Sequence, residues 1–136
     1  MDVQQSRDGV GLVWAVLFDN EMIGYWPAQL FRSLGNGATD LEIGGEVAFS
    51  SRPPGTRLSK TQMGSGSFPS KGYRHAAFIR GIQIWGDDGN EFDPDEESHE
   101  TKPECYQVRY LTSDIPRWGK HLYYGGPGGD SPDCVA

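Results

Sequence analysis

The residue best suited to chemistry is Glu46, in the stretch Leu41-Glu42-Ile43-Gly44-Gly45-Glu46-Val47. Gly44, its neighbour on the same face of an extended chain, has no side chain, and Gly45 lets another chain approach the backbone closely. A carboxylate beside such a space can act on a substrate, and two carboxylates can divide the work of general base and general acid. Taken alone, the stretch favours an ordinary solvent-facing glutamate, because perturbed carboxylates are few in any protein.

A second group of candidates follows in Thr61-Gln62-Met63-Gly64-Ser65-Gly66. Gln62, Gly64 and Ser65 could offer amide, backbone N–H and hydroxyl donors to a developing oxyanion. The alternative, a glycine turn between strands, is favoured by the composition of the stretch. Glu42 is the only other acid on the Glu46 face of its stretch, and at two positions, ~7 Å along a strand, it does not make a convincing pair.

Serine hydrolysis is not expected. His75, His99 and His121 are available as bases, but none has a supporting motif, and Gly64-Ser65-Gly66 lacks the strand–turn–helix setting of a nucleophilic serine. No two histidines have the spacing of metal ligands. Five aromatic residues could build a groove for a peptide or a sugar, although aromatic residues of a β protein more often form the core. They are Tyr25, Trp26, Trp85, Tyr123 and Tyr124.

The framework that must position these groups is predicted to be all-β. The 136 residues include 19 glycines and nine prolines, which favours short strands joined by turns. Apolar alternation and β-branched or aromatic residues predict strands at residues 12–18, 22–26, 39–49, 76–85, 105–110 and 121–124. Pro27 opens one predicted helix, residues 27–34. We therefore expect an antiparallel β-sandwich with one short helix, and the small number of strands predicts an incomplete half of it.

The net charge of −7 is concentrated in residues 87–104, which hold nine acidic residues and one lysine. Asp93, Asp95 and Glu97 alternate as Ca²⁺ ligands could, but the glycine and terminal glutamate of an EF-hand loop are absent. A solvated loop is favoured, and no metal or other cofactor is expected. The acidity argues against a nucleic-acid partner. No apolar run approaches the ~18 residues that span a bilayer, so no membrane partner is expected.

Cys105 and Cys134 could form one disulfide or remain two buried thiols. The position of Cys134 near the terminus favours a disulfide, which would tie down the tail and imply an oxidising compartment. The N-terminal residues lack the apolar region of a signal peptide. The combination predicts that sequence is missing upstream.

Several motifs follow one another along the chain: Ile23-Gly24-Tyr25-Trp26-Pro27, Leu30-Phe31, Gly44-Gly45-Glu46-Val47, Thr61-Gln62-Met63-Gly64-Ser65-Gly66, Cys105-Tyr106, Trp118-Gly119, Tyr123-Tyr124-Gly125-Gly126-Pro127-Gly128 and Cys134. Each is weak alone. In this order they closely resemble the C-terminal half of the plant neprosin domain, over roughly residues 12–134.

The resemblance implies a secreted glutamic endopeptidase of antiparallel β-sandwich fold that cleaves after proline in acid conditions with two glutamates. Glu46 matches the second glutamate, Cys105 and Cys134 match a disulfide pair, and the substrate is a proline-containing peptide or protein. Residues 12–136 are then the C-terminal half of a catalytic domain, and residues 1–11 a truncated N-terminal segment.

The other catalytic glutamate of the family has no match in the chain, since neither Glu21 nor Glu42 fits its position. The isolated chain is therefore expected to be inactive. A non-catalytic β module that binds peptide or cell-wall material is the alternative function.

Overall fold

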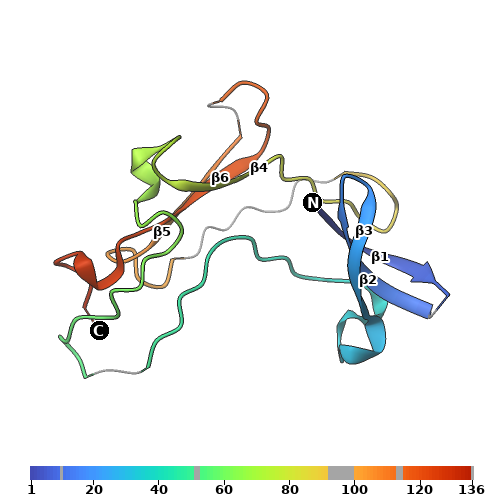
Figure 1. Cartoon of the computed structure of the whole chain (residues 1–136), viewed down its shortest axis with the longest axis horizontal. Coiled ribbons are helices and arrows are strands. Elements are labelled where there is room, and N and C mark those ends of the chain that lie inside the picture. Colours follow the sequence, from blue (N-terminus) through green and yellow to red (C-terminus); the bar gives the residue numbers. More distant parts are fainter. Residues whose placement is uncertain (10, 51–52, 92–99, 113–114, 136) are drawn as a thin grey trace. The chain divides into compact units, whose positions relative to one another are not determined.

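The computed structural model describes residues 1–9, 11–50, 53–91, 100–112 and 115–135. The chain divides into two compact units, Met1–Glu42 and Ile43–Ala136. Each unit contains one three-stranded antiparallel sheet, and the only helical elements of the described residues are short 3-10 turns (Figure 1). The all-β prediction is confirmed, while the packing of sheets into a sandwich stays a prediction. No helix in the described ranges is long and apolar enough to cross a membrane.

The first unit is a meander of β1 (Asp2–Asp8), β2 (Gly11–Phe18) and β3 (Glu21–Pro27), with β2 in the centre. Asp19 and Asn20 join β2 to β3 with φ of 50° and 64°, the left-handed conformation that two-residue hairpin turns require. The strands predicted at residues 12–18 and 22–26 are confirmed. β1 was not predicted, because its polar residues carry no apolar alternation; it forms by pairing along its whole length with β2.

The helix predicted at residues 27–34 is wrong. The chain makes two 3-10 turns instead, η1 (Ala28–Leu30) and η2 (Leu34–Asn36), and Phe31 between them is extended at φ −109° and ψ 133°. The Leu34 carbonyl accepts hydrogen bonds from Trp14 Nε1 (3.1 Å) and Gln5 Nε2 (3.3 Å). Side chains of the sheet thus hold this segment in a conformation that local helix propensity does not determine.

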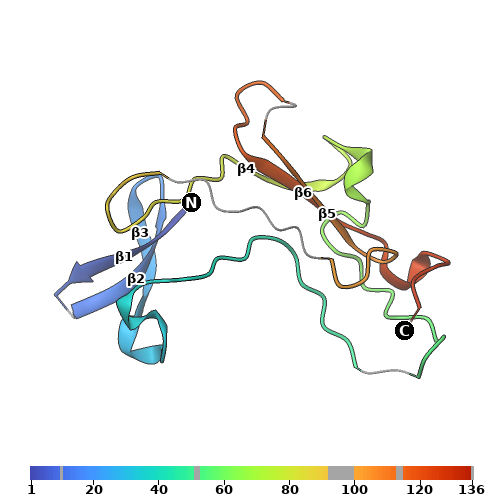
Figure 2. The same cartoon turned by 180° about the vertical axis from the view of Figure 1, so that it is seen from behind.

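The second unit contains β4 (Ala77–Arg80), β5 (Gln107–Leu111) and β6 (His121–Gly125), together with the 3-10 turns η3 (Pro69–Lys71) and η4 (Gly128–Asp130). The strand order is β4-β6-β5, so the last strand in sequence is the central one, as Figures 1 and 2 show from opposite sides. Cys105 is bonded to Cys134, which confirms the predicted disulfide. The two cysteines are buried together with Leu58 in one core cluster. A second core cluster consists of Ala76, Trp118 and Tyr123.

Three predicted strands differ from those observed. The strand predicted at residues 105–110 is β5, which begins at Gln107. The strand predicted at residues 76–85 ends at Arg80, because Gly81 has φ +64° and its N–H turns to the Trp118 carbonyl. Residues 39–49 form no strand at all, since no described segment supplies a hydrogen-bonding neighbour. An extended sequence pattern becomes a strand only where a second backbone lies beside it.

Candidate functional site

The Gly44-Gly45-Glu46 segment lies against the central strand of the second sheet. A Cβ atom on Gly45 would come within 2.8 Å of both Met63 Sδ and Tyr124 Cδ2, a spacing that real Cβ atoms do not adopt. Glycine is therefore needed at position 45 because the protein's own Met63 and Tyr124 approach the backbone closely there. This contact fixes the backbone immediately before Glu46.

The turn that contains Gln62, Gly64 and Ser65 lies beside the same strand. The Met63 N–H donates to the Gly126 carbonyl (3.0 Å), and the Gly66 N–H closes the turn on the Met63 carbonyl (3.0 Å). Gly64 has φ +62°, and a Cβ there would meet the Ala77 side chain at 2.6 Å. Gly45 and the turn thus meet at Met63 and Tyr124, which brings together two stretches that the sequence had singled out separately.

Glu46 itself is on the accessible side of its segment. Ile43 and Val47 are half-buried, whereas Gly44 and Glu46 are exposed. Among the described residues, no hydrogen bond or ion pair engages the Glu46 carboxylate. The side chain is therefore open to solvent, next to a backbone that Met63 and Tyr124 hold from the other side.

The polar side chains of this turn are engaged in contacts within the protein. The Ser65 hydroxyl donates to the His75 carbonyl (2.6 Å) and accepts the Ser67 N–H (3.4 Å). Its single proton is therefore occupied in this structure. The Gln62 amide lies against Gly66, where an added Cβ would come within 2.6 Å of Oε1. The substrate-binding role of these residues stays a prediction.

Tyr25 and Trp26 belong to the first unit, whereas the other substrate-binding candidates, Gln62, Gly64 and Ser65, belong to the second. Because they are neighbours on β3, the side chains of Tyr25 and Trp26 lie on opposite faces of the sheet. Trp26 is the cross-strand partner of Trp14, and Tyr25 is that of Ala15. Both are substantially exposed. The remaining aromatic candidates belong to the second unit, where Tyr123 is buried in the core, so the five aromatic residues do not share one structural role.

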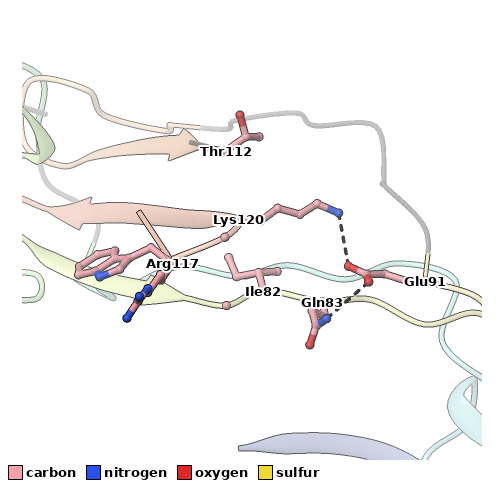
Figure 3. Close-up of a pocket in the computed structure, with 9 residues that line it drawn as sticks. Ile82, Gln83, Glu91, Thr112, Arg117 and Lys120 are labelled. Atoms are coloured by element: carbon pink, nitrogen blue, oxygen red, sulfur yellow. Dashed lines mark hydrogen bonds and ion pairs between the residues drawn. The ribbon is translucent and has the colours of Figure 1, made fainter. Parts of the chain in front are cut away.

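Sequence reasoning missed a cavity of about 580 Å³ in the second unit (Figure 3). Glu91 connects two of its polar side chains: Lys120 Nζ lies 3.7 Å from Oε1, and Gln83 Nε2 donates to Oε2 at 3.5 Å. Other lining residues include Ile82, Thr112 and Arg117. Both contacts are long, and no sequence motif joins these positions.

Two ionisable groups with shifted pKa values stabilise turns. The side-chain amide of Asn90 and then its backbone N–H donate to Asp88 (2.9 and 3.0 Å) and lower the pKa of that carboxyl. Burial raises the pKa of Tyr106, whose hydroxyl donates to the Thr61 carbonyl (2.8 Å). The Tyr106 contact anchors the start of the Gln62 turn to the disulfide region.

In the part of the chain that the structure describes, no group of three or more His, Cys, Asp or Glu residues is arranged to hold a metal ion. The Ca²⁺ alternative at Asp93, Asp95 and Glu97 lies outside the described residues, as does His99.

Among known protein families, the family model described as Neprosin matches residues 1–127 of the chain. The matched range contains every strand of both units and the stretches around Glu46 and Ser65. It begins at residue 1, earlier than the resemblance noted from the motifs.

Proposed function

Because this chain belongs to the neprosin family, we propose that it forms part of a glutamic-type endopeptidase in which Glu46 is one of two catalytic carboxylates. The observation that supports the proposal is the contact of Gly45 with Met63 and Tyr124, which leaves the neighbouring Glu46 exposed on a supported backbone. Such a carboxylate can hold a water molecule beside a bound peptide.

The chemistry that we propose is direct attack of water on the scissile amide. One carboxylate accepts a proton from the water, and the other, protonated, donates to the leaving nitrogen, so that no covalent enzyme intermediate is needed. The family's other glutamate has no match at Glu21 or Glu42, and we therefore propose that the second carboxylate comes from another part of the polypeptide or from another chain. The substrate that we propose is a proline-containing peptide, cleaved after proline at acid pH.

The setting that we propose is extracellular. The Cys105–Cys134 disulfide supports it, because disulfides persist in oxidising compartments.

The experiment compares Glu46→Gln with Glu42→Gln in cleavage of a fluorogenic proline-containing peptide at acid pH. The two substitutions are matched: both glutamates are exposed in one segment, and both changes remove one negative charge. Loss of a proton-transfer group costs on the order of 10²–10⁴-fold in rate. We expect a loss of that size in kcat for Glu46→Gln and a change below about threefold for Glu42→Gln.

The assay is run on the chain alone and on the chain expressed together with the rest of a neprosin catalytic domain. Activity that survives Glu46→Gln would exclude the role given to Glu46. An inactive chain that still binds the peptide supports the second candidate function, a non-catalytic binding module, which the lack of a matching second glutamate at Glu21 or Glu42 favours.

A further inference from the structure

The first unit contains a pocket of about 260 Å³ that no sequence motif had indicated. Three aromatic side chains and one carboxylate are among its lining residues, which are Val3, Trp14, Trp26, Phe31, Leu34, Ala38 and Asp40. The pocket is shallow and open to solvent, and its volume is below that of drug-sized ligand sites, which are ~300–1,000 Å³, so it suits a single side chain.

Hydrogen bonds from the sheet hold one wall of this pocket in place. Trp14 Nε1 donates to the Leu34 carbonyl at 3.1 Å, which fixes the orientation of the indole. Gln5 Nε2 donates to the same carbonyl and to that of Gly35 (3.4 Å), and so ties η2 to β1. Trp14 and Trp26 are direct cross-strand partners on one face of the sheet. The aromatic wall is therefore preorganised and does not depend on a ligand for its shape.

Trp26 is 49% exposed although it lines this pocket. A tryptophan this exposed, beside two other aromatic residues, can offer the negative face of its π-system to a ligand. Such faces attract a cation, and tryptophan does so most strongly. The aromatic lining therefore selects for positive charge as well as for apolar surface.

The net negative charge of the first unit also favours a cationic ligand. Residues 1–42 contain six acidic residues against two arginines, Arg7 and Arg32. Asp40, which lines the pocket, accepts the Thr39 hydroxyl at Oδ2 (2.8 Å), while Oδ1 has no hydrogen-bond partner among the described residues. A carboxylate with an oxygen available, in a unit of negative charge, complements a cationic group.

We propose that this pocket binds the guanidinium group of an arginine side chain in a peptide or protein partner. Arginine fits better than lysine because its planar group can stack on the Trp14 and Trp26 rings and also donate to a carboxylate. This site is separate from the role given to Glu46, and it stands whether or not the chain takes part in catalysis.

The test uses N-acetyl-arginine amide and its neutral isostere, N-acetyl-citrulline amide, titrated into the full chain. Binding is followed by NMR through the indole N–H signals of the four tryptophans, assigned by single substitutions. We expect the Trp14 and Trp26 signals to move with arginine and those of Trp85 and Trp118 to stay. We expect arginine to bind at least about fivefold more tightly than citrulline, the discrimination of one moderately exposed cation–π site.

Variants separate the two sources of selectivity. Trp26→Leu should abolish the shift of the Trp14 signal, whereas Trp85→Leu, at an exposed tryptophan outside the pocket, should leave it unchanged. Asp40→Asn should weaken arginine binding about threefold and leave citrulline binding the same, the size of a surface ion pair. Trp26→Phe keeps an aromatic ring and should retain part of the affinity if Trp26→Leu fails to fold.

Equal binding of arginine and citrulline would overturn the proposal, because the pocket would then recognise shape and not charge. Arginine shifts confined to Trp85 or Trp118 would overturn it as well. The citrulline comparison needs no variant, so it gives an answer even if every substitution in the pocket destabilises the unit.

Discussion

The two sheets of this protein differ in how far apart along the chain their strands lie. β1, β2 and β3 follow one another with short turns, and the central strand is the second in sequence. In the second sheet the central strand, β6, is the last in sequence and pairs with both β4 and β5. The acidic segment, residues 87–104, lies between β4 and β5 along the chain. The first unit is therefore built from local pairing, and the second from contacts that close long loops.

The second unit also contains constraints of a kind that the first does not show in its described residues. The disulfide connects positions 29 residues apart. Gly126 and Gly129 pack so closely on the carbonyl groups of Cys105 and Leu58 that a Cβ on either would overlap them. Gly24 in β3, by contrast, has open space at its Cβ position. The second unit therefore depends on a few close contacts between distant segments, whereas the β1–β3 meander depends on pairing spread along its strands.

Removal of the disulfide is expected to give the largest effect. Replacing both Cys105 and Cys134 with alanine frees a loop of 29 residues, and chain entropy predicts a loss of about 3–4 kcal/mol in the free energy of unfolding. Amide hydrogen exchange should accelerate in β5 and β6 far more than in β1–β3. An equal increase of the exchange rate in both sheets would contradict the proposal that only the second unit depends on the disulfide.

A pair of glycine substitutions tests the close contacts. Gly126→Ala places a methyl group on the Cys105 carbonyl and should cost roughly 2–3 kcal/mol, as overpacking in a tight site does. Gly24→Ala meets nothing within 4 Å and should change stability by less than about 1 kcal/mol, towards stabilisation. Urea denaturation of both variants measures the difference, and similar losses would show that packing around Gly126 is not the decisive feature.

The smallest effect concerns Tyr106, which connects positions 45 residues apart through its hydrogen bond to Thr61. Tyr106→Phe removes this bond and should cost about 1 kcal/mol at neutral pH.

The same substitution should also change the dependence of stability on pH. Burial raises the pKa of Tyr106 in the folded protein, so its contribution is complete below the pKa of an unfolded tyrosine, ~10, and falls as pH rises through the folded-state pKa. The stability difference between wild type and variant should therefore narrow above pH ~10. A difference that stays constant with pH would contradict the assigned environment of Tyr106.

The family and part of the strand framework could be read from the amino-acid sequence. Apolar and aromatic runs identified residues 12–18, 22–26, 121–124 and most of 105–110 as strands, because side chains of these types fit a pleated surface wherever it forms. The motif series correctly indicated the neprosin family, and with it the partner of Cys105. These features depend on the types of residues that lie close together in sequence, or on the order of motifs along the chain.

Which backbones become neighbours depends on the tertiary structure and could not be predicted from local residue types. β1 is a strand because β2 pairs with it, and residues 39–49 are not, despite a better strand pattern, because no described backbone pairs with them. In the same way, Gly45 meets Tyr124, and the Ser65 hydroxyl donates to the His75 carbonyl. Propensity acts within a few residues, whereas a hydrogen-bonding partner or a close contact depends on how distant segments fold together.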